Sequence, residues 1–147
     1  MAEQTESQIV IDAPAPAIMA VIADLRRYPE WSEGVRAVEV TAEQADGRPI
    51  EATLSIDSGP IKDTYELHYS WDGDESVSWS LRKAQLLTRL DGSYTLTPGE
   101  TGTNVRYRLT VDVRMPMIGL LKRKAEKVII DTALKGLKKR VEAAAGG

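Results

Sequence analysis

From Val35 to about Met115, apolar residues recur at every second position, and short turns such as Asp46-Gly47 interrupt the alternation. A period of two is typical of strands with one apolar and one polar face. The segment therefore predicts six antiparallel strands joined by short turns, and the apolar face of such a sheet requires a cover. Asp91-Gly92 is compatible with either a hairpin turn or a bulge inside one strand.

Helical patterns at both ends of the chain can supply the cover. A short strand at 9–12 is followed by a predicted helix from about Pro14 to Arg26. Tyr28-Pro29 is expected to end this helix because a residue before proline avoids the helical conformation. Residues 29–33 could form a second short helical turn that ends at Gly34, and one long amphipathic helix is predicted from about Met117 to Ala144. The 147 residues are expected to form one domain over 8–145, with flexible ends at 1–7 and 146–147.

Composition excludes several kinds of site. The chain has 0 Cys and 1 His, which excludes disulfides, thiol nucleophiles and metal sites with two imidazoles, so we expect no metal and no cofactor. A net charge of −3 makes DNA an unfavourable partner. The acidic, polar start differs from a signal peptide, and the apolar stretch at 13–23 is too short to span a bilayer. We therefore expect a soluble, cytoplasmic protein, either a monomer or a weak dimer.

Three local motifs resemble a known superfamily. They are the Asp12-Ala13-Pro14-Ala15 segment that leads through a helix to Tyr28-Pro29-Glu30-Trp31, the strand pair at 92–96 and 103–109, and the helix after Met115-Pro116. Together with the element order, they resemble the SRPBCC/START-like superfamily, which includes polyketide cyclases/dehydrases, lipid-transfer domains, coenzyme-Q-binding proteins and the birch-pollen-allergen type. The resemblance covers about Ile9 to Val141. It implies a bacterial α+β protein with the helix-grip fold, β-α-α-β6-α, in which a curved antiparallel sheet wraps around the C-terminal helix and encloses a cavity.

The alternation predicts which side chains line that cavity. The candidate ligand-binding residues are Trp31, Leu54, Ile56, Tyr65, Leu67, Tyr69, Trp71, Trp79, Leu81, Tyr94, Tyr107, Leu109, Val128, Ile129, Thr132 and Gly136. Met19, Val111, Leu121 and Ala125 share the same faces. On the long helix, small residues such as Gly136 and Ala133 are expected to leave space beside the sheet.

Tyrosine takes the place of phenylalanine in this chain. The aromatic residues are 5 Tyr and 3 Trp, with 0 Phe, and most fall on the inward face. Hydroxyls beside an apolar wall suit a ligand such as a quinone, polyketide, sterol or fatty acid. The alternative is that these side chains fill an ordinary core.

An enzymatic interpretation has few candidate residues. The resemblance implies that some relatives are aromatases or cyclases that use an inward Arg, Tyr or acidic group, for which Arg89, Tyr65, Tyr94 and Asp63 are candidates. Arg89 and the single His68 alternate with the inward series, so both are expected to face water. We therefore assign no catalytic residue.

The C-terminal helix carries 8 of the 19 Lys and Arg residues. A solvated face that complements the helix dipole explains this without any partner. A functional alternative is contact with an anionic membrane through Lys122, Arg123, Lys135, Lys138 and Lys139, with an apolar lip at 115–120.

The first functional hypothesis is a carrier or sequestering protein that binds a lipid, quinone or polyketide-like molecule between the sheet and the long helix. A polyketide cyclase, aromatase or dehydratase is the alternative. A module that docks to the ribosome, a chaperone or a membrane through its basic helix is the second alternative.

Overall fold

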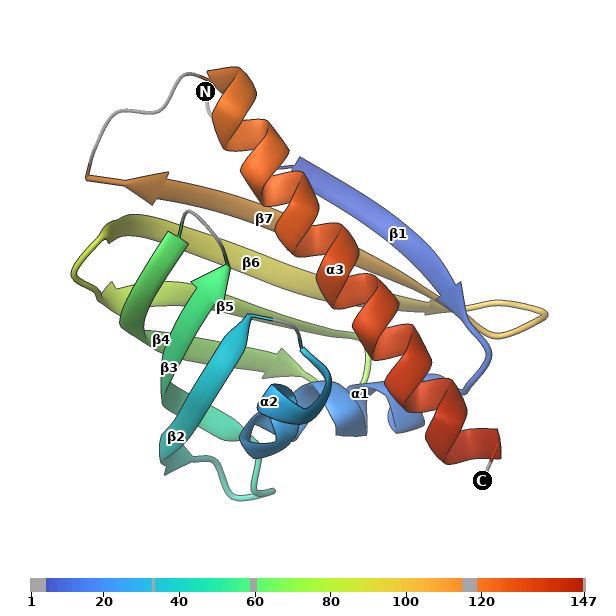
Figure 1. Cartoon of the computed structure of the whole chain (residues 1–147). Coiled ribbons are helices and arrows are strands. Elements are labelled where there is room, and N and C mark those ends of the chain that lie inside the picture. The colour runs from blue at the N-terminus through green and yellow to red at the C-terminus, as the bar shows by residue number, and fades with distance from the viewer. Residues whose placement is uncertain (1–4, 33, 59–60, 115–118, 147) are drawn as a thin grey trace.

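The computed structural model describes residues 5–32, 34–58, 61–114 and 119–146. Its strands are β1 (Thr5–Ile11), β2 (Val35–Glu43), β3 (Pro49–Ser58), β4 (Ile61–Asp72), β5 (Ser76–Lys83), β6 (Leu87–Pro98) and β7 (Thr103–Val113). Its helices are α1 (Ala15–Ala23), a 3₁₀ turn (Leu25–Arg27), α2 (Tyr28–Trp31) and α3 (Gly119–Gly146). Figure 1 shows α3 crossing one face of the sheet, with α1 and α2 beside one end of it.

The strands form one antiparallel sheet in the order β1-β7-β6-β5-β4-β3-β2. The prediction of six antiparallel strands after residue 35 is confirmed, and β1 adds a seventh strand through pairs such as Ile9 with Val105. β6 runs unbroken through Asp91-Gly92, so this dipeptide is not a hairpin turn. The register shift in the β6–β7 pairing lies between Leu87 and Arg89 instead.

The prediction of a second short helical turn is confirmed by α2, but the prediction that Tyr28-Pro29 ends the first helix is wrong. The first helix already ends at Ala23, and α2 begins at Tyr28 with Pro29 in its first turn. Proline is tolerated there because the first backbone N–H groups of a helix have no partner within the helix. The Tyr28 side chain is therefore held at the start of α2 rather than at the end of α1.

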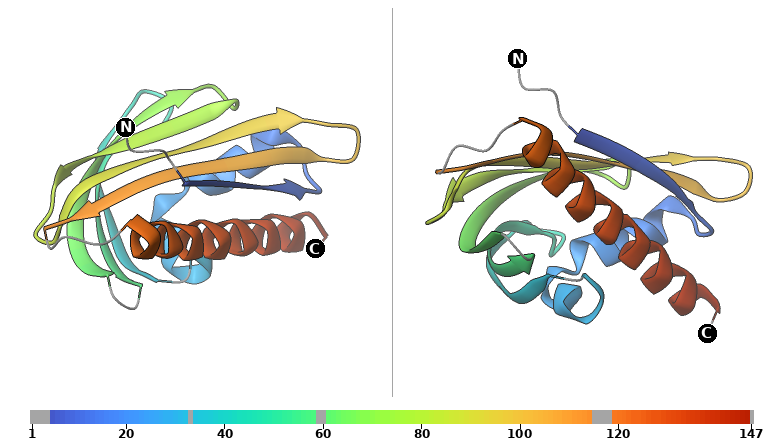
Figure 2. Two further views of the ribbon diagram at one scale, coloured as in Figure 1. Left: turned by 90° about the horizontal axis from the view of Figure 1, so that it is seen from above. Right: turned by 45° about the horizontal axis from the view of Figure 1, so that its top comes forward.

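α3 packs on β1 and β7 and also contacts α1 and α2. Ile130, Leu134, Leu137 and Val141 recur at helical spacing and are buried in this contact. Figure 2 shows the sheet bending, with α3, α1 and α2 on its concave side. The α+β fold class expected from the sequence is confirmed.

A buried carboxylate fixes α3 to the sheet. Glu126 is 1% exposed, and it accepts hydrogen bonds from Thr5 Oγ1 at 2.6 Å and from the backbone N–H of Val111 at 2.7 Å. Lys122 Nζ lies 3.7 Å from the same carboxylate. Because these bonds hold α3 against β1 and β7, the helix lies at one side of the concave face, and a space remains between it and the strands from β3 to β7.

Candidate functional site

A cavity of about 310 Å³ occupies this space between the sheet, α3 and the segment that joins α2 to β2. Its described lining consists of Tyr28, Ser32, Gly34, Val35, Leu54, Ile56, Asp57, Tyr65, Leu67, Tyr69, Trp79, Leu90, Tyr94, Tyr107, Leu109, Val111, Val128, Ile129, Thr132 and Ala133. The volume lies at the lower end of the range typical of small-molecule sites, and the lining is mostly apolar, as in such sites.

The structure places twelve of the sixteen candidate residues along this cavity: Leu54, Ile56, Tyr65, Leu67, Tyr69, Trp79, Tyr94, Tyr107, Leu109, Val128, Ile129 and Thr132. The sheet residues share the concave face because side chains at every second position of a strand point the same way. Val111 and Ala133 also line the cavity. That these residues bind a ligand remains a prediction.

Two candidates from the sheet lie outside the cavity lining. Trp71 is near the end of β4, where its indole N–H donates to the Pro49 carbonyl at 2.6 Å and the Arg48 guanidinium lies 5.3 Å from its ring. Leu81 pairs with Leu67, one residue beyond the last pair between β5 and β6, which joins Ser80 to Asp91. Alternation predicts the correct face for these two residues, but it does not predict where along a strand the cavity ends.

Two candidates from the helices also lie outside the lining, because they contact each other. A Cβ placed on Gly136 would lie 2.7 Å from the Trp31 carbonyl oxygen and 3.4 Å from its ring. Gly136 therefore provides close contact between α3 and α2 rather than open space beside the sheet. Met19 is buried in the core and Ala125 is partly buried, and neither lines the cavity. Of the proposed apolar lip, residues 115–118 lie outside the described residues, and so do the side chains of Leu120 and Leu121.

Six lining residues were not among the candidates: Tyr28, Ser32, Gly34, Val35, Asp57 and Leu90. Leu90 has the same parity as Tyr94 in β6, so the alternation contained the signal for it. The segment from Tyr28 to Gly34 has no strand periodicity. Its position depends on the start of α2 and on the contact of α2 with α3.

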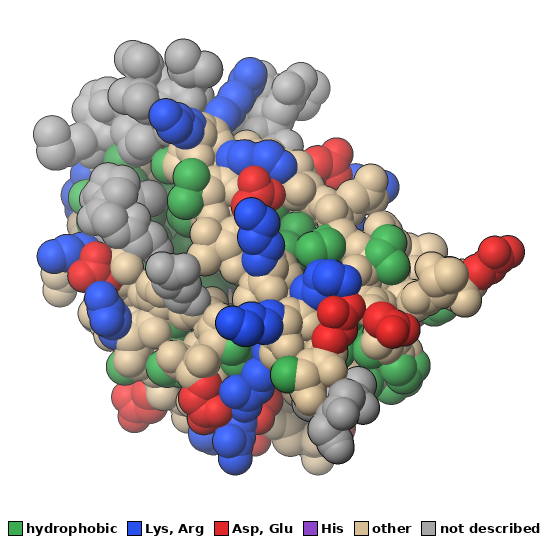
Figure 3. Space-filling view, turned by 45° about the vertical axis from the view of Figure 1, so that its right-hand side comes forward, with side chains coloured by type: hydrophobic (Ala, Val, Ile, Leu, Met, Phe, Trp, Pro, Cys, Tyr) green, Lys and Arg blue, Asp and Glu red, His purple; other side chains and the backbone are tan. Residues whose placement is uncertain are grey.

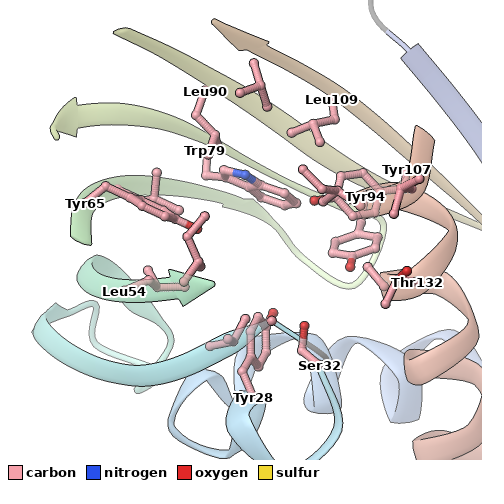
Figure 4. Close-up of a pocket in the computed structure, with 18 of the residues that line it drawn as sticks. Tyr28, Ser32, Leu54, Tyr65, Trp79, Leu90, Tyr94, Tyr107, Leu109 and Thr132 are labelled. Atoms are coloured by element: carbon pink, nitrogen blue, oxygen red, sulfur yellow. The ribbon is translucent and has the colours of Figure 1, made fainter. Parts of the chain in front are cut away.

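Aromatic rings form the centre of the sheet wall. Tyr94 and Tyr107 are directly paired in the register, and their ring centroids are 4.6 Å apart. The Trp79 ring lies 5.4 Å from Tyr94, 5.7 Å from Tyr107 and 5.9 Å from Tyr69. Figure 4 shows Trp79 in the middle of the wall, with Tyr94 and Tyr107 toward Thr132 of α3, Tyr65 near Leu54, and Tyr28 and Ser32 on the opposite side.

The tyrosine hydroxyls differ in their partners. The Tyr28 hydroxyl donates to the Ile22 carbonyl. Within the described part of the chain, the hydroxyls of Tyr65, Tyr69, Tyr94 and Tyr107 make no hydrogen bond to another residue. The only fully buried side-chain oxygen without a partner among these residues is that of Thr110, so the four phenol oxygens remain accessible from the cavity.

Burial raises the pKa of the Tyr94 phenol well above its ordinary value, and Tyr107 and Tyr69 raise it further. Burial likewise raises the pKa of Tyr65, Tyr69 and Tyr107. A phenol with a raised pKa stays protonated at neutral pH, where it can donate a hydrogen bond but cannot act as an anionic base.

Two other residues considered for catalysis, Asp63 and Arg89, are bonded to groups outside the cavity. Asp63 is buried, but its carboxylate accepts hydrogen bonds from the backbone N–H groups of Thr64, Gln85, Leu86 and Leu87 and holds the β5–β6 connection. Arg89 is exposed and its Nε lies 2.7 Å from Asp91.

His68 is exposed on the other face of the sheet, as its parity predicted. Among the described residues, no group of three His, Asp or Glu side chains is placed to hold a metal ion.

Lys124, Lys135 and Lys139 are exposed on α3 at helical spacing, and we define them as the basic stripe. Figure 3 shows several Lys and Arg side chains on this side of the molecule, with Asp and Glu side chains among them. These three residues form no ion pair with any other described residue. The exposed Val128 lies on the same stripe at helical spacing and also lines the cavity, so the stripe borders the rim. None of the described helices has the length and apolar character needed to cross a membrane.

The five basic residues expected to contact a membrane are not equivalent. Lys122 lies 3.2 Å from Asp112, and Lys138 lies 2.6 Å from Glu142 and donates to the Val10 carbonyl. Arg123, Lys135 and Lys139 have no such partner among the described residues and are exposed.

Comparison with solved structures supports the fold. A START superfamily protein from Mycobacterium smegmatis matches with a TM-score of 0.89 and 19% identity, covering 97% of this chain and 99% of that one. The Zhui aromatase/cyclase from a Streptomyces species matches with a TM-score of 0.80 and 16% identity, covering 99% and 98%. A Thermus thermophilus protein matches with a TM-score of 0.80 and 22% identity, covering 97% and 99%.

The match to a protein family covers nearly the whole chain. A comparison with curated proteins found no match. Residues 2–142 match the family described as polyketide cyclase / dehydrase and lipid transport. The resemblance inferred from the sequence motifs is confirmed, and this chain belongs to the polyketide cyclase/dehydrase and lipid transport family.

Proposed function

We propose that this protein binds a hydrophobic small molecule in the cavity between the sheet and α3, as a carrier or sequestering protein. The observation that carries the proposal is the enclosed wall of Trp79, Tyr94 and Tyr107 beside apolar residues such as Leu109. Removing about 200 Å² of apolar ligand surface from water contributes about 5 kcal/mol. The family description, which includes lipid transport, supports the same function.

A neutral fluorescent probe tests this proposal. N-phenyl-1-naphthylamine becomes bright in an apolar site, and we expect it to bind with a stoichiometry of one per chain. Ala133→Trp places a large side chain in the cavity lining and should weaken probe binding at least tenfold. Lys135→Trp, two residues further along α3 and exposed, is the matched control and should bind the probe normally. Equal binding by both variants, or no saturable binding by the unmodified protein, would contradict the proposal.

The basic stripe supports a proposal about where the ligand is exchanged. Lys124, Lys135 and Lys139 border the rim beside the exposed Val128, so contact with an anionic membrane would bring the cavity close to the lipid. Each basic residue near such a surface contributes about 1 kcal/mol. Reversing all three charges to Glu should therefore abolish sedimentation with phosphatidylserine vesicles at low salt, while probe binding in solution stays normal. Binding to vesicles that is unchanged by the triple variant would contradict membrane contact through this stripe.

Ring-closing chemistry is the alternative that the family description raises. Tyr65 and Tyr94 line the cavity, as that alternative requires. Against it, the Asp63 carboxylate is occupied by four backbone N–H groups and Arg89 is exposed and paired with Asp91. The described lining therefore supports binding more directly than catalysis.

A further inference from the structure

The polar side chains that line the cavity are, with one exception, uncharged. Of the twenty described lining residues, Asp57 alone has a charged side chain, and that charge is negative. The cations beside it are Arg36, whose Nη2 lies 3.8 Å from the Asp57 carboxylate, and Lys62, whose Nζ lies 3.7 Å from it. Both cations are therefore directed to Asp57 at this part of the lining.

The remaining donors are neutral. Tyr94 and Tyr107 place two phenols side by side on β6 and β7, and within the described residues neither hydroxyl has a protein partner. Thr132 lies across from them on α3 (Figure 4). Since burial raises the pKa of both phenols, their protons stay in place and are available to a ligand.

These neutral donors favour a ligand with a carbonyl oxygen over a ligand with a carboxylate. A carbonyl oxygen accepts a hydrogen bond from a phenol and has no charge to desolvate. A carboxylate loses its hydration when it enters an apolar site, and without a balancing cation that loss is large. The flat Trp79 ring in the middle of the wall adds a surface on which an aromatic ligand can pack.

We propose that the cavity selects neutral aromatic molecules that carry a carbonyl oxygen, that it excludes the corresponding carboxylates, and that Tyr94 and Tyr107 bind the oxygen. This inference rests on the proposed function, because it names the ligand class of the same cavity. It separates quinones and polyketide-like ketones from free fatty acids, all of which the amino-acid sequence left open.

Three ligands of similar shape test the inference by calorimetric titration at pH 7.5. 2-Isopropylnaphthalene has no oxygen, 2-acetylnaphthalene is a neutral ketone and 2-naphthoate is an anion. The ketone should bind at least about tenfold more tightly than 2-naphthoate. The hydrocarbon should also bind, because apolar burial alone drives its association.

Tyrosine variants identify the groups responsible. Tyr94→Phe and Tyr107→Phe keep the rings and remove only the hydroxyls. Each variant should therefore bind the ketone about three- to tenfold more weakly and bind the hydrocarbon with unchanged affinity. Ser93→Ala is the matched control, because it also removes one hydroxyl from β6 but on the face of the sheet away from the cavity, and it should leave the preference for ketone over hydrocarbon unchanged. Circular dichroism verifies that each variant is folded.

The outcomes distinguish this inference from the proposed function. If 2-naphthoate binds as tightly as the ketone, or if both Phe variants bind the ketone normally, the inference is overturned while hydrophobic binding stands. If none of the three ligands binds, both the inference and the proposed function are overturned.

Discussion

Gly136 of α3 lies against the backbone of Trp31 in α2, so closely that a Cβ on Gly136 would be 2.7 Å from the Trp31 carbonyl oxygen. Beyond Trp31, Ser32 and Gly34 lie in the cavity wall, and Tyr28 at the start of α2 packs its ring against Trp31 at a centroid distance of 4.9 Å. The contact between two helices therefore positions one side of the cavity.

Gly136→Ala tests this contact, because the sign of the change in the free energy of unfolding depends on it. Alanine normally stabilises a helix relative to glycine by about 1 kcal/mol. Here the added methyl group would collide with a carbonyl oxygen, so we expect the free energy of unfolding to fall by about 1–3 kcal/mol in urea titrations. Lys135→Ala, at an exposed neighbouring position, should change it by less than about 0.5 kcal/mol. A stabilised Gly136→Ala protein would show that α2 does not lie against α3.

Gly92→Ala tests the position of Trp79. The two residues are paired between β5 and β6, and the Trp79 indole occupies the place where a Cβ of Gly92 would lie. The indole must move away in the variant, which should change the near-ultraviolet circular dichroism and reduce the affinity for N-phenyl-1-naphthylamine. Ser93→Ala, at the next position on the other face of β6, should leave the spectrum and the probe affinity unchanged. An unaltered spectrum in Gly92→Ala would contradict this packing.

Strand alternation predicted the sheet wall because each inward residue follows from its neighbours two positions away. Tyr107 and Leu109 on β7 are clear examples. The same rule placed Trp71 on the correct face but could not show that its indole is bonded to the Pro49 carbonyl, beyond the cavity. The end of a cavity depends on contacts between strands that are distant in the sequence.

The positions of α2 and α3, which lie opposite the sheet, could not be predicted from the sequence for a different reason. Tyr28-Pro29 was interpreted as the stop between two helical segments, whereas Tyr28 is the first residue of the second. Glu126 lies in a strongly basic segment that is typical of an exposed face, yet it is buried because its partners are Thr5 and Val111. Glu126 precedes Ile130 by four residues, so helical spacing places it on the buried face of α3. Its partners lie in β1 and β7, and helical spacing contains no signal for them.

Glu126→Ala should destabilise the protein more than any exposed carboxylate on the same helix. The substitution leaves the buried N–H of Val111 without a hydrogen-bond acceptor, which lowers the free energy of unfolding by about 1–3 kcal/mol. Asp131→Ala is the control, since Asp131 is paired with Lys127 at 3.2 Å near the surface and contributes less than about 1 kcal/mol. Urea unfolding of the two variants measures the difference. Equal losses would show that Glu126 does not anchor α3.

Asp63 should make stability depend on pH. Burial acts to raise its pKa, but the four backbone N–H donors outweigh burial and hold the pKa of this carboxyl below its ordinary value of 3.8. Because the folded pKa is lowered, the stabilising contribution is present above about pH 4 and is lost as the pH falls through the folded pKa.

Asp63→Asn isolates this contribution. The amide cannot accept all four hydrogen bonds, so the variant should be less stable than the unmodified protein by about 1–3 kcal/mol at pH 7. The difference between the two proteins should narrow as the pH is lowered from about 4 to about 2 in urea titrations. A difference that is constant over this range would contradict the role assigned to the ionised carboxylate.

The most direct test of ligand binding in the cavity is the position of a bound ligand measured by intermolecular nuclear Overhauser effects. With 2-isopropylnaphthalene, we expect contacts to the side chains of Trp79, Tyr107 and Leu109, all of which line the cavity. Saturable binding whose contacts are confined to surface residues such as Val10, which is 49% exposed, would show that the ligand does not bind in the cavity.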